Sequence, residues 1–88
     1  MRNVHAWKTR TPEGERREVK AHFFAKKWTL KAKVRGEESW TEYDEPLLDD
    51  LIDLRLILFN KYQRHRTAWE HVESVEKLIR ERGGSWED

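Results

Sequence analysis

The sequence predicts a single α+β domain in which a small antiparallel meander of three or four strands precedes a C-terminal two-helix hairpin, in the order ββββαα. Three observations support this prediction. Apolar and polar residues alternate through much of residues 3–43, as they do in half-buried strands. Apolar residues then recur at helical spacing over two segments, about 45–65 and 68–82. A chain of 88 residues suits one domain, expected at 1–83, with a flexible tail at 84–88.

The composition limits the class of protein. The chain is 40% charged but contains five tryptophans, whose large apolar area favours a folded core over disorder. It has no cysteine, which excludes disulfides and thiolate metal sites. No apolar run reaches the ~20 residues of a membrane-spanning helix, and residues 1–10 lack the apolar run of a secretory signal. We therefore expect a small soluble, cytoplasmic protein that has no membrane partner.

The net charge of +1 conceals three differently charged segments. Residues 1–35 contain eleven Lys or Arg and three Glu, residues 36–60 contain one Arg and eight Asp or Glu, and residues 61–88 contain six of each sign. A strongly basic segment is therefore followed by an acidic one. This local asymmetry says more about possible partners than the pI of the whole chain.

The first three strands follow from the alternation. Residues 4–9 alternate weakly, and a turn around Gly14 leads into a second strand at 17–24. A short hairpin loop at 25–27 precedes the third strand, at 28–35. This strand has the clearest alternation, because its apolar residues point one way and its basic residues the other. It is predicted to be a half-buried antiparallel strand with a basic outer face.

A fourth, shorter strand at 39–43 has two possible registers. A two- or four-residue loop places Ser39 opposite Val34, so that Trp40 faces outward. A three-residue loop places Trp40 opposite Val34 instead, so that Trp40 and Glu42 face inward. The sequence leaves both registers open.

The first helix has an unusually broad apolar face, an arc of roughly 200° where a surface helix usually shows about 100°. This arc predicts partners on two sides, with the sheet on one and the second helix on the other. Asp44 or Glu45 is expected to cap the helix, and acidic residues precede basic ones as its dipole favours. The capping-box pattern Thr67-Ala-Trp-Glu70 opens the second helix, and Gly83 ends it. The apolar seam of the second helix comprises Ala68, Val72, Val75 and Ile79.

Arg55 is a charged residue near the middle of the apolar arc of the first helix. Its guanidinium group either snorkels to the helix edge, or pairs with a carboxylate or stacks on a tryptophan. Glu42 is the best candidate carboxylate if the register turns it inward. We expect a structural role for Arg55 in either case.

No constellation of residues points to catalysis. No pair of the four histidines has the spacing of a zinc motif, and the acidic residues around Asp49 and Asp53 are explained by the dipole of the first helix. The sequence contains no nucleophile elbow and no glycine-rich phosphate loop. The expectation is a protein without enzymatic activity, metal or cofactor.

The outer face of the sheet carries the one pattern with functional content. Cations project from it, with a tryptophan beside them in the first register, and this combination suits phosphate contact and base stacking. The predicted nucleic-acid-binding residues are Lys8, Lys20, His22, Lys31, Lys33, Arg35 and Trp40, with Arg10 as an alternative neighbour to Lys8. The competing interpretation is a solvated, lysine-rich face that keeps the strands soluble.

Two functional hypotheses follow. The first is a DNA- or RNA-binding protein that contacts mainly the phosphate backbone. In the order of its elements the chain resembles phage-integrase arm-binding domains and plant AP2-type domains, and this resemblance implies DNA contact through a sheet backed by one helix; the second helix is additional here. The alternative is a protein-interaction or homodimerisation module, in which the helical hairpin, with an exposed Ile57 and the tail residue Trp86, binds another protein or a second copy.

Overall fold

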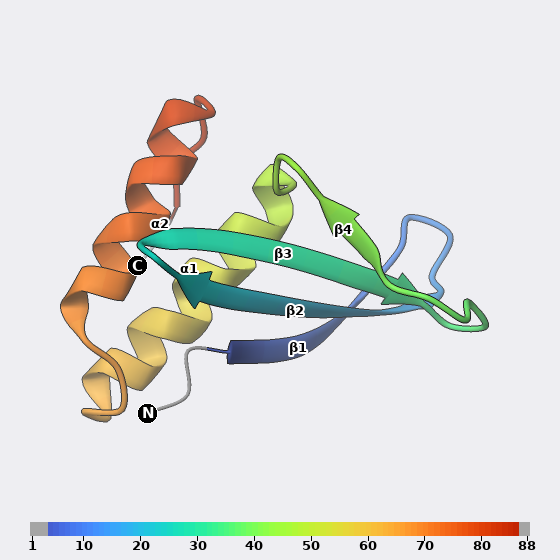
Figure 1. Cartoon of the computed structure of the whole chain (residues 1–88), viewed down its shortest axis with the longest axis horizontal. Coiled ribbons are helices and arrows are strands. Elements are labelled where there is room, and N and C mark those ends of the chain that lie inside the picture. The colour runs from blue at the N-terminus through green and yellow to red at the C-terminus, as the bar shows by residue number, and fades with distance from the viewer. Residues whose placement is uncertain (1–3, 87–88) are drawn as a thin grey trace. The chain divides into compact units, whose positions relative to one another are not determined.

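The computed structural model describes residues 4–86, which contain four strands and two helices joined by turns (Figure 1). The strands are β1 (Val4–Arg10), β2 (Arg16–Phe24), β3 (Lys27–Val34) and β4 (Thr41–Tyr43), and the helices are α1 (Leu48–Gln63) and α2 (Trp69–Glu81). The strands pair antiparallel in one sheet, in the order β1-β2-β3-β4. The predicted α+β order ββββαα is therefore confirmed, with four strands.

The chain divides between Pro46 and Leu47 into two compact units, one containing the sheet and the other the helices. The expectations that residues 1–83 form one domain and that the first helix crosses the apolar face of the sheet stay predictions.

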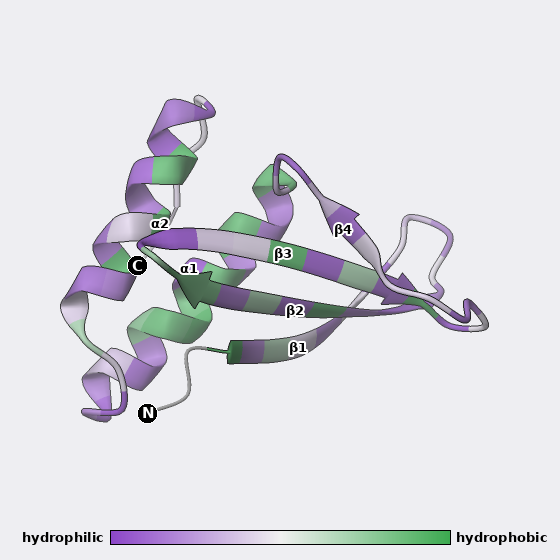
Figure 2. Ribbon diagram, viewed as in Figure 1, coloured by the Kyte–Doolittle hydropathy of each residue, from purple (hydrophilic) through white to green (hydrophobic). Residues whose placement is uncertain are grey.

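One face of the sheet is buried and the other is exposed. Apolar and polar residues alternate along β2 and β3, as Figure 2 shows. On the inner face Val19, Ala21 and Leu30 have no accessible surface. The ring of Trp28 packs beside them, with its centroid 4.8 Å from that of Phe23. These contacts fix which side chains project from the opposite, outer face, because neighbours along a strand point to opposite sides.

The turn between β2 and β3 consists of Ala25 and Lys26. It is one residue shorter than the predicted loop, because Lys27 already belongs to β3. Both turn residues have positive φ, 51° and 63°. Positive φ at both central positions marks the two-residue turn whose twist matches that of the flanking strands. Neither residue is glycine, so the sequence indicated a short loop here but not this type of turn.

The pairing of β3 with β4 selects between the two registers. Ala32 lies opposite Thr41, and Leu30 lies opposite Tyr43. This is the first register, with Trp40 on the outer face of the sheet. Glu42 lies opposite Lys31 on the same outer face and is exposed.

In the second unit, α1 and α2 pack against each other as a helical hairpin. The buried apolar residues of α1 are Leu51, Leu54 and Leu58, and those of α2 are Val72, Val75 and Ile79. The buried stripe of α1 is narrower than the predicted arc, because Leu47, Leu56 and Tyr62 are 40–52% exposed. Ala68, expected in the seam of α2, is exposed.

Both helix starts differ from the prediction. α1 begins at Leu48, after an extended Leu47 without a side-chain cap, so neither Asp44 nor Glu45 caps it. Pro46 disfavours helical geometry at Glu45, the residue before it, and the helix begins two residues after the proline. α2 begins one residue later than the capping box requires, and the Thr67 hydroxyl lies 3.3 Å from Nδ1 of His71.

Arg55 pairs with Glu76, not with Glu42 as proposed from the sequence. Its Nε donates a 3.0 Å hydrogen bond to Oε2 of Glu76, and Nη2 lies 3.0 Å from the same oxygen. The guanidinium group also lies over the rings of Phe59, at 4.6 Å, and Trp86, at 5.3 Å. Glu42 could not take this role because its register places it on the outer face of the sheet.

Trp86, within the segment expected to be a tail, contacts two arginines. Its ring centroid lies 5.3 Å from the guanidinium carbon of Arg55 and 4.9 Å from that of Arg80. The indole is thus a docking anchor within the helical unit. The flexibility expected for residues 84–88 stays a prediction, and positions 87–88 lie outside the described residues.

Candidate nucleic-acid interface

The outer face of the sheet is predominantly basic. Among the described residues of the four strands, seven cations occupy outward positions, against two carboxylates. The cations are Lys8, Arg10, Arg16, Lys20, Lys27, Lys31 and Lys33, and the carboxylates are Glu18 and Glu42. The two carboxylates lie beside Lys33 and Lys31, respectively, and reduce the field without reversing its sign.

The ring of Trp40 lies over this face, beside a lysine of β2 and a lysine of β3. The antiparallel register places Lys20 directly opposite Lys31. Like charges in that position destabilise a sheet. The Nζ atoms of Lys20 and Lys31 lie 4.7 Å and 5.8 Å from the centroid of the Trp40 ring, within the range of a cation–π interaction. The indole therefore offsets part of the repulsion and holds two cations beside an aromatic surface.

Two depressions extend the basic face from Trp40 toward β1. The smaller, of about 170 Å³, is lined by Ala6, Trp7, Lys8, Glu18, Val19, Lys20 and Trp40. The larger and more open one, of about 540 Å³, is lined by Lys8, Thr9, Arg10 and Arg16. Lys8 borders both depressions. The two depressions thus have Lys8 in common, and cations of β1 and β2 line both of them, which suits an anionic ligand.

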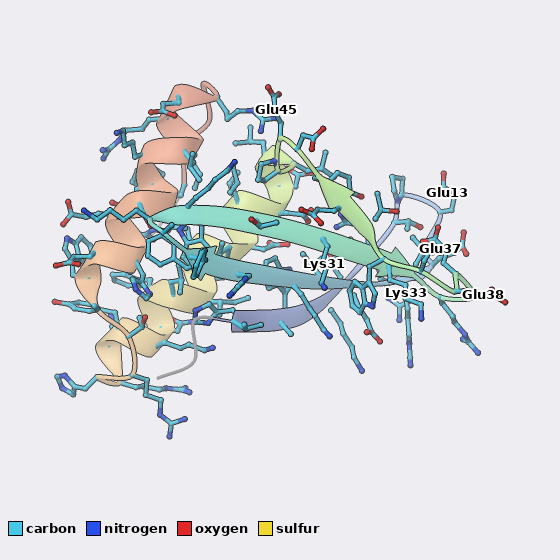
Figure 3. The ribbon with its side chains drawn as sticks, viewed as in Figure 1. Glu13, Lys31, Lys33, Glu37, Glu38 and Glu45 are labelled. Atoms are coloured by element: carbon cyan, nitrogen blue, oxygen red, sulfur yellow. The ribbon has the colours of Figure 1, made fainter. Side chains whose placement is uncertain are left out.

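Carboxylates gather at one end of the sheet. Figure 3 shows Lys31 and Lys33 along β3, Glu37 and Glu38 in the turn that follows, and Glu13 in the turn between β1 and β2. The Glu37 carboxylate accepts a 2.7 Å hydrogen bond from the backbone N–H of Val34. These carboxylates reduce the positive potential at that end of the sheet.

An exposed aromatic pair lies at the other end of β2. His22 and Phe24 both point outward, and their rings are nearly parallel, with centroids 6.2 Å apart and planes at 24°. Phe24 is 74% exposed, more than any other large apolar residue among those described. The alternation of β2 placed Phe24 on the outer face, but its significance as a candidate site residue was missed.

The structure brings together most of the residues predicted for the interface. The outward set on β1, β2, β3 and the approach to β4 includes Lys8, Lys20, His22, Lys31, Lys33 and Trp40. The sequence placed Arg35 within the third strand, but β3 ends at Val34. Arg35 begins the turn, where its backbone N–H donates to the carbonyl of Arg16. Sequence reasoning also missed Arg16, because the predicted second strand began one residue too late to include it.

No three His, Asp or Glu residues lie together as a metal site would need, in the part of the chain from 4 to 86. No helix in that part is long and apolar enough to span a membrane. Comparisons with models of protein families, with curated proteins and with solved structures found no match.

Proposed function

We propose that this protein is a small, non-enzymatic nucleic-acid-binding protein that uses the outer face of its sheet, mostly through contacts with the phosphate backbone. The observation that carries the proposal is Trp40, half-buried on that face with the ammonium groups of Lys20 and Lys31 beside its ring. A ring flanked by cations provides the two chemical features of nucleic-acid contact, stacking surface and phosphate neutralisation.

The arrangement of charge also supports the proposal. A lysine-rich face that serves only solubility needs no concave surface and no indole at its centre. Here Lys8, Arg10 and Arg16 surround an open depression that adjoins the one beside Trp40. Backbone contact of this kind does not depend on base sequence.

The first prediction is a steep salt dependence of binding. With about four phosphate contacts, a fourfold rise in salt concentration weakens binding by roughly 50- to 150-fold, because condensed counterions are released on binding. Fluorescence anisotropy with labelled DNA and RNA oligonucleotides, at two salt concentrations, measures this change. Replacing Lys8, Lys31 and Lys33 by Glu, all three at outward positions of the sheet, should abolish most binding at low salt.

A charge-matched control uses three exposed cations of the helical unit, changed as Arg64→Glu, Arg66→Glu and Lys77→Glu. This variant has the same net charge as the sheet variant and should keep its affinity within about threefold. Equal losses in the two variants would show that only overall charge matters. Absence of binding by the unaltered protein at low salt would disprove the proposed function.

A second candidate function is protein binding by the helical unit. Its support is an exposed aromatic pair, Tyr62 and Trp69, whose ring centroids are 5.0 Å apart, beside an open depression along α2. The depression is lined by Trp69, Glu70, Glu73, Ser74, Glu76, Lys77 and Arg80. Light scattering tests the homodimer version directly, since a monomer at high concentration excludes it. The exposed aliphatic residue of α1 is Leu56; Ile57, the residue expected from the sequence, is half-buried.

A further inference from the structure

The outer sheet face has two aromatic positions rather than one. Trp40 lies near Lys20, and Phe24 lies at the end of the same strand, beside His22. The inner face already has its own aromatic cluster of His5, Phe23 and Trp28. Phe24 therefore contributes nothing to that cluster, and a phenylalanine with three quarters of its surface exposed is costly to solvate.

The distance between the two positions distinguishes single strands from duplexes. Lys20 marks the position of Trp40 along β2, because its ammonium group lies beside the Trp40 ring. Lys20 and Phe24 are four residues apart on this strand, which corresponds to about 13 Å at 3.3 Å per residue. Stacked bases in a duplex are about 3.4 Å apart along each strand, and their faces are hidden in the stack. In a single strand the bases can be splayed apart, so that non-adjacent bases each stack on a separate aromatic ring.

Cations lie beside both rings. Lys20 and Lys31 border Trp40, and Lys27 lies opposite Phe24 in the pairing of β2 with β3. A phosphate backbone that follows β2 would therefore meet ammonium groups near each ring. Separated aromatic rings beside cations are the combination used for single strands without sequence preference.

We infer that the ligand of this face is a single-stranded nucleic acid, with one base stacked on Trp40 and a non-adjacent base stacked on Phe24. The inference rests on the proposed function, because it presupposes that the basic face binds nucleic acid. It adds the class of nucleic acid and the residue Phe24, which phosphate contact alone does not require.

The test compares oligo-dT, oligo-U and a DNA duplex of matched length at one salt concentration. We expect both single strands to bind more tightly than the duplex. Phe24→Ala and Trp40→Ala should each weaken single-strand binding by about 5- to 150-fold, the range for loss of one stacked base. Duplex affinity and the salt dependence of binding should change by less than twofold, since no phosphate contact is removed.

Two controls identify stacking as the cause. Phe24→Leu keeps apolar bulk but removes the ring, and it should lose as much affinity as Phe24→Ala. Leu56→Ala removes an exposed apolar side chain from α1, 52% exposed, and should leave binding unchanged. Circular dichroism verifies that the variants stay folded, which is expected because Phe24 is on the surface.

The outcomes separate this inference from the proposed function. Equal affinity for duplex and single strands, without loss in Phe24→Ala, would overturn the inference while leaving phosphate-backbone binding intact. Binding of neither ligand would overturn both. A loss of self-association in Phe24→Ala, seen by light scattering with nucleic-acid affinity unaltered, would make a second copy of the chain the occupant and also overturn the inference.

Discussion

Arg55 and Trp40 combine charge and aromatic surface in opposite ways. Arg55 is 3% exposed, and its charge is matched by the Glu76 carboxylate and by the rings of Phe59 and Trp86. Trp40 is half-buried and has two lysines whose repulsion it only partly offsets. The first arrangement neutralises charge within the helical unit, whereas the second presents charge on a surface. Arg55 is therefore a structural residue and Trp40 a candidate binding residue.

The residue-scale prediction concerns the buried pair. Arg55→Met should lower the free energy of unfolding by about 3–5 kcal/mol, because it leaves the Glu76 carboxylate buried without its partner. The double change Arg55→Met with Glu76→Met should recover most of this loss, since it removes both charges. Chemical denaturation of the two variants measures the difference. A single variant as stable as the unaltered protein would contradict the role assigned to the pair.

At the scale of elements, the two helices end in the same way with different residues. After α1 the backbone N–H of Arg66 donates to the carbonyl of Lys61, and that of His65 donates to Tyr62. After α2, Gly84 donates to Ile79 and Gly83 donates to Arg80 in the same pattern. Both ends are Schellman motifs, which need positive φ at the first residue beyond the cap. Glycine satisfies this need after α2, whereas His65 adopts φ of 60° after α1.

The element-scale prediction follows from that contrast. His65→Gly should stabilise the protein by about 0.5–1 kcal/mol, because a side chain is disfavoured at positive φ. Gly83→Ala should destabilise it by about 1 kcal/mol for the same reason, since the φ of Gly83 is 75°. Thermal unfolding measures both, with shifts of several degrees in opposite directions. Shifts of the same sign would show that backbone conformation does not control these ends.

At the scale of the whole molecule, the question is whether the two units fold together. The boundary between the units lies between Pro46 and Leu47, so each has fewer than about 50 residues. Each is thus close to the size of about 40 residues below which a chain usually needs a disulfide, a metal or a partner to fold, and this protein has no cysteine. The single domain predicted from the sequence is therefore the more favourable expectation.

The whole-molecule prediction is one cooperative unfolding transition. Replacing Trp69 and Trp86 by Phe leaves tryptophans only in the sheet unit, so fluorescence reports the sheet while far-ultraviolet circular dichroism reports mainly the helices. The two denaturation midpoints should coincide if the units unfold together. Midpoints separated by more than their error would show two independently folding units.

The sequence by itself determined the kind and order of the elements. The strict alternation of β3 and the apolar spacings of α1 and α2 are local periodicities, and each follows from where successive side chains point along a strand or helix. The basic character of the outer face follows in the same way from Lys31 and Lys33. The outward positions of Lys8, Lys20 and His22 could be predicted once the strand boundaries were known, and the sequence placed those boundaries within a few residues.

Tertiary structure decided what depends on pairing between distant residues. Both registers of β4 satisfied the local pattern, and only its hydrogen-bonded alignment with β3 placed Trp40 outward beside Lys20. Glu76 replaced Glu42 as the partner of Arg55 because the packing of α2 on α1, 21 residues along the chain, brings the two side chains together. Strand register and helix packing depend on contacts between segments that are far apart in the chain. The local pattern of one segment does not show which of these contacts is most favourable.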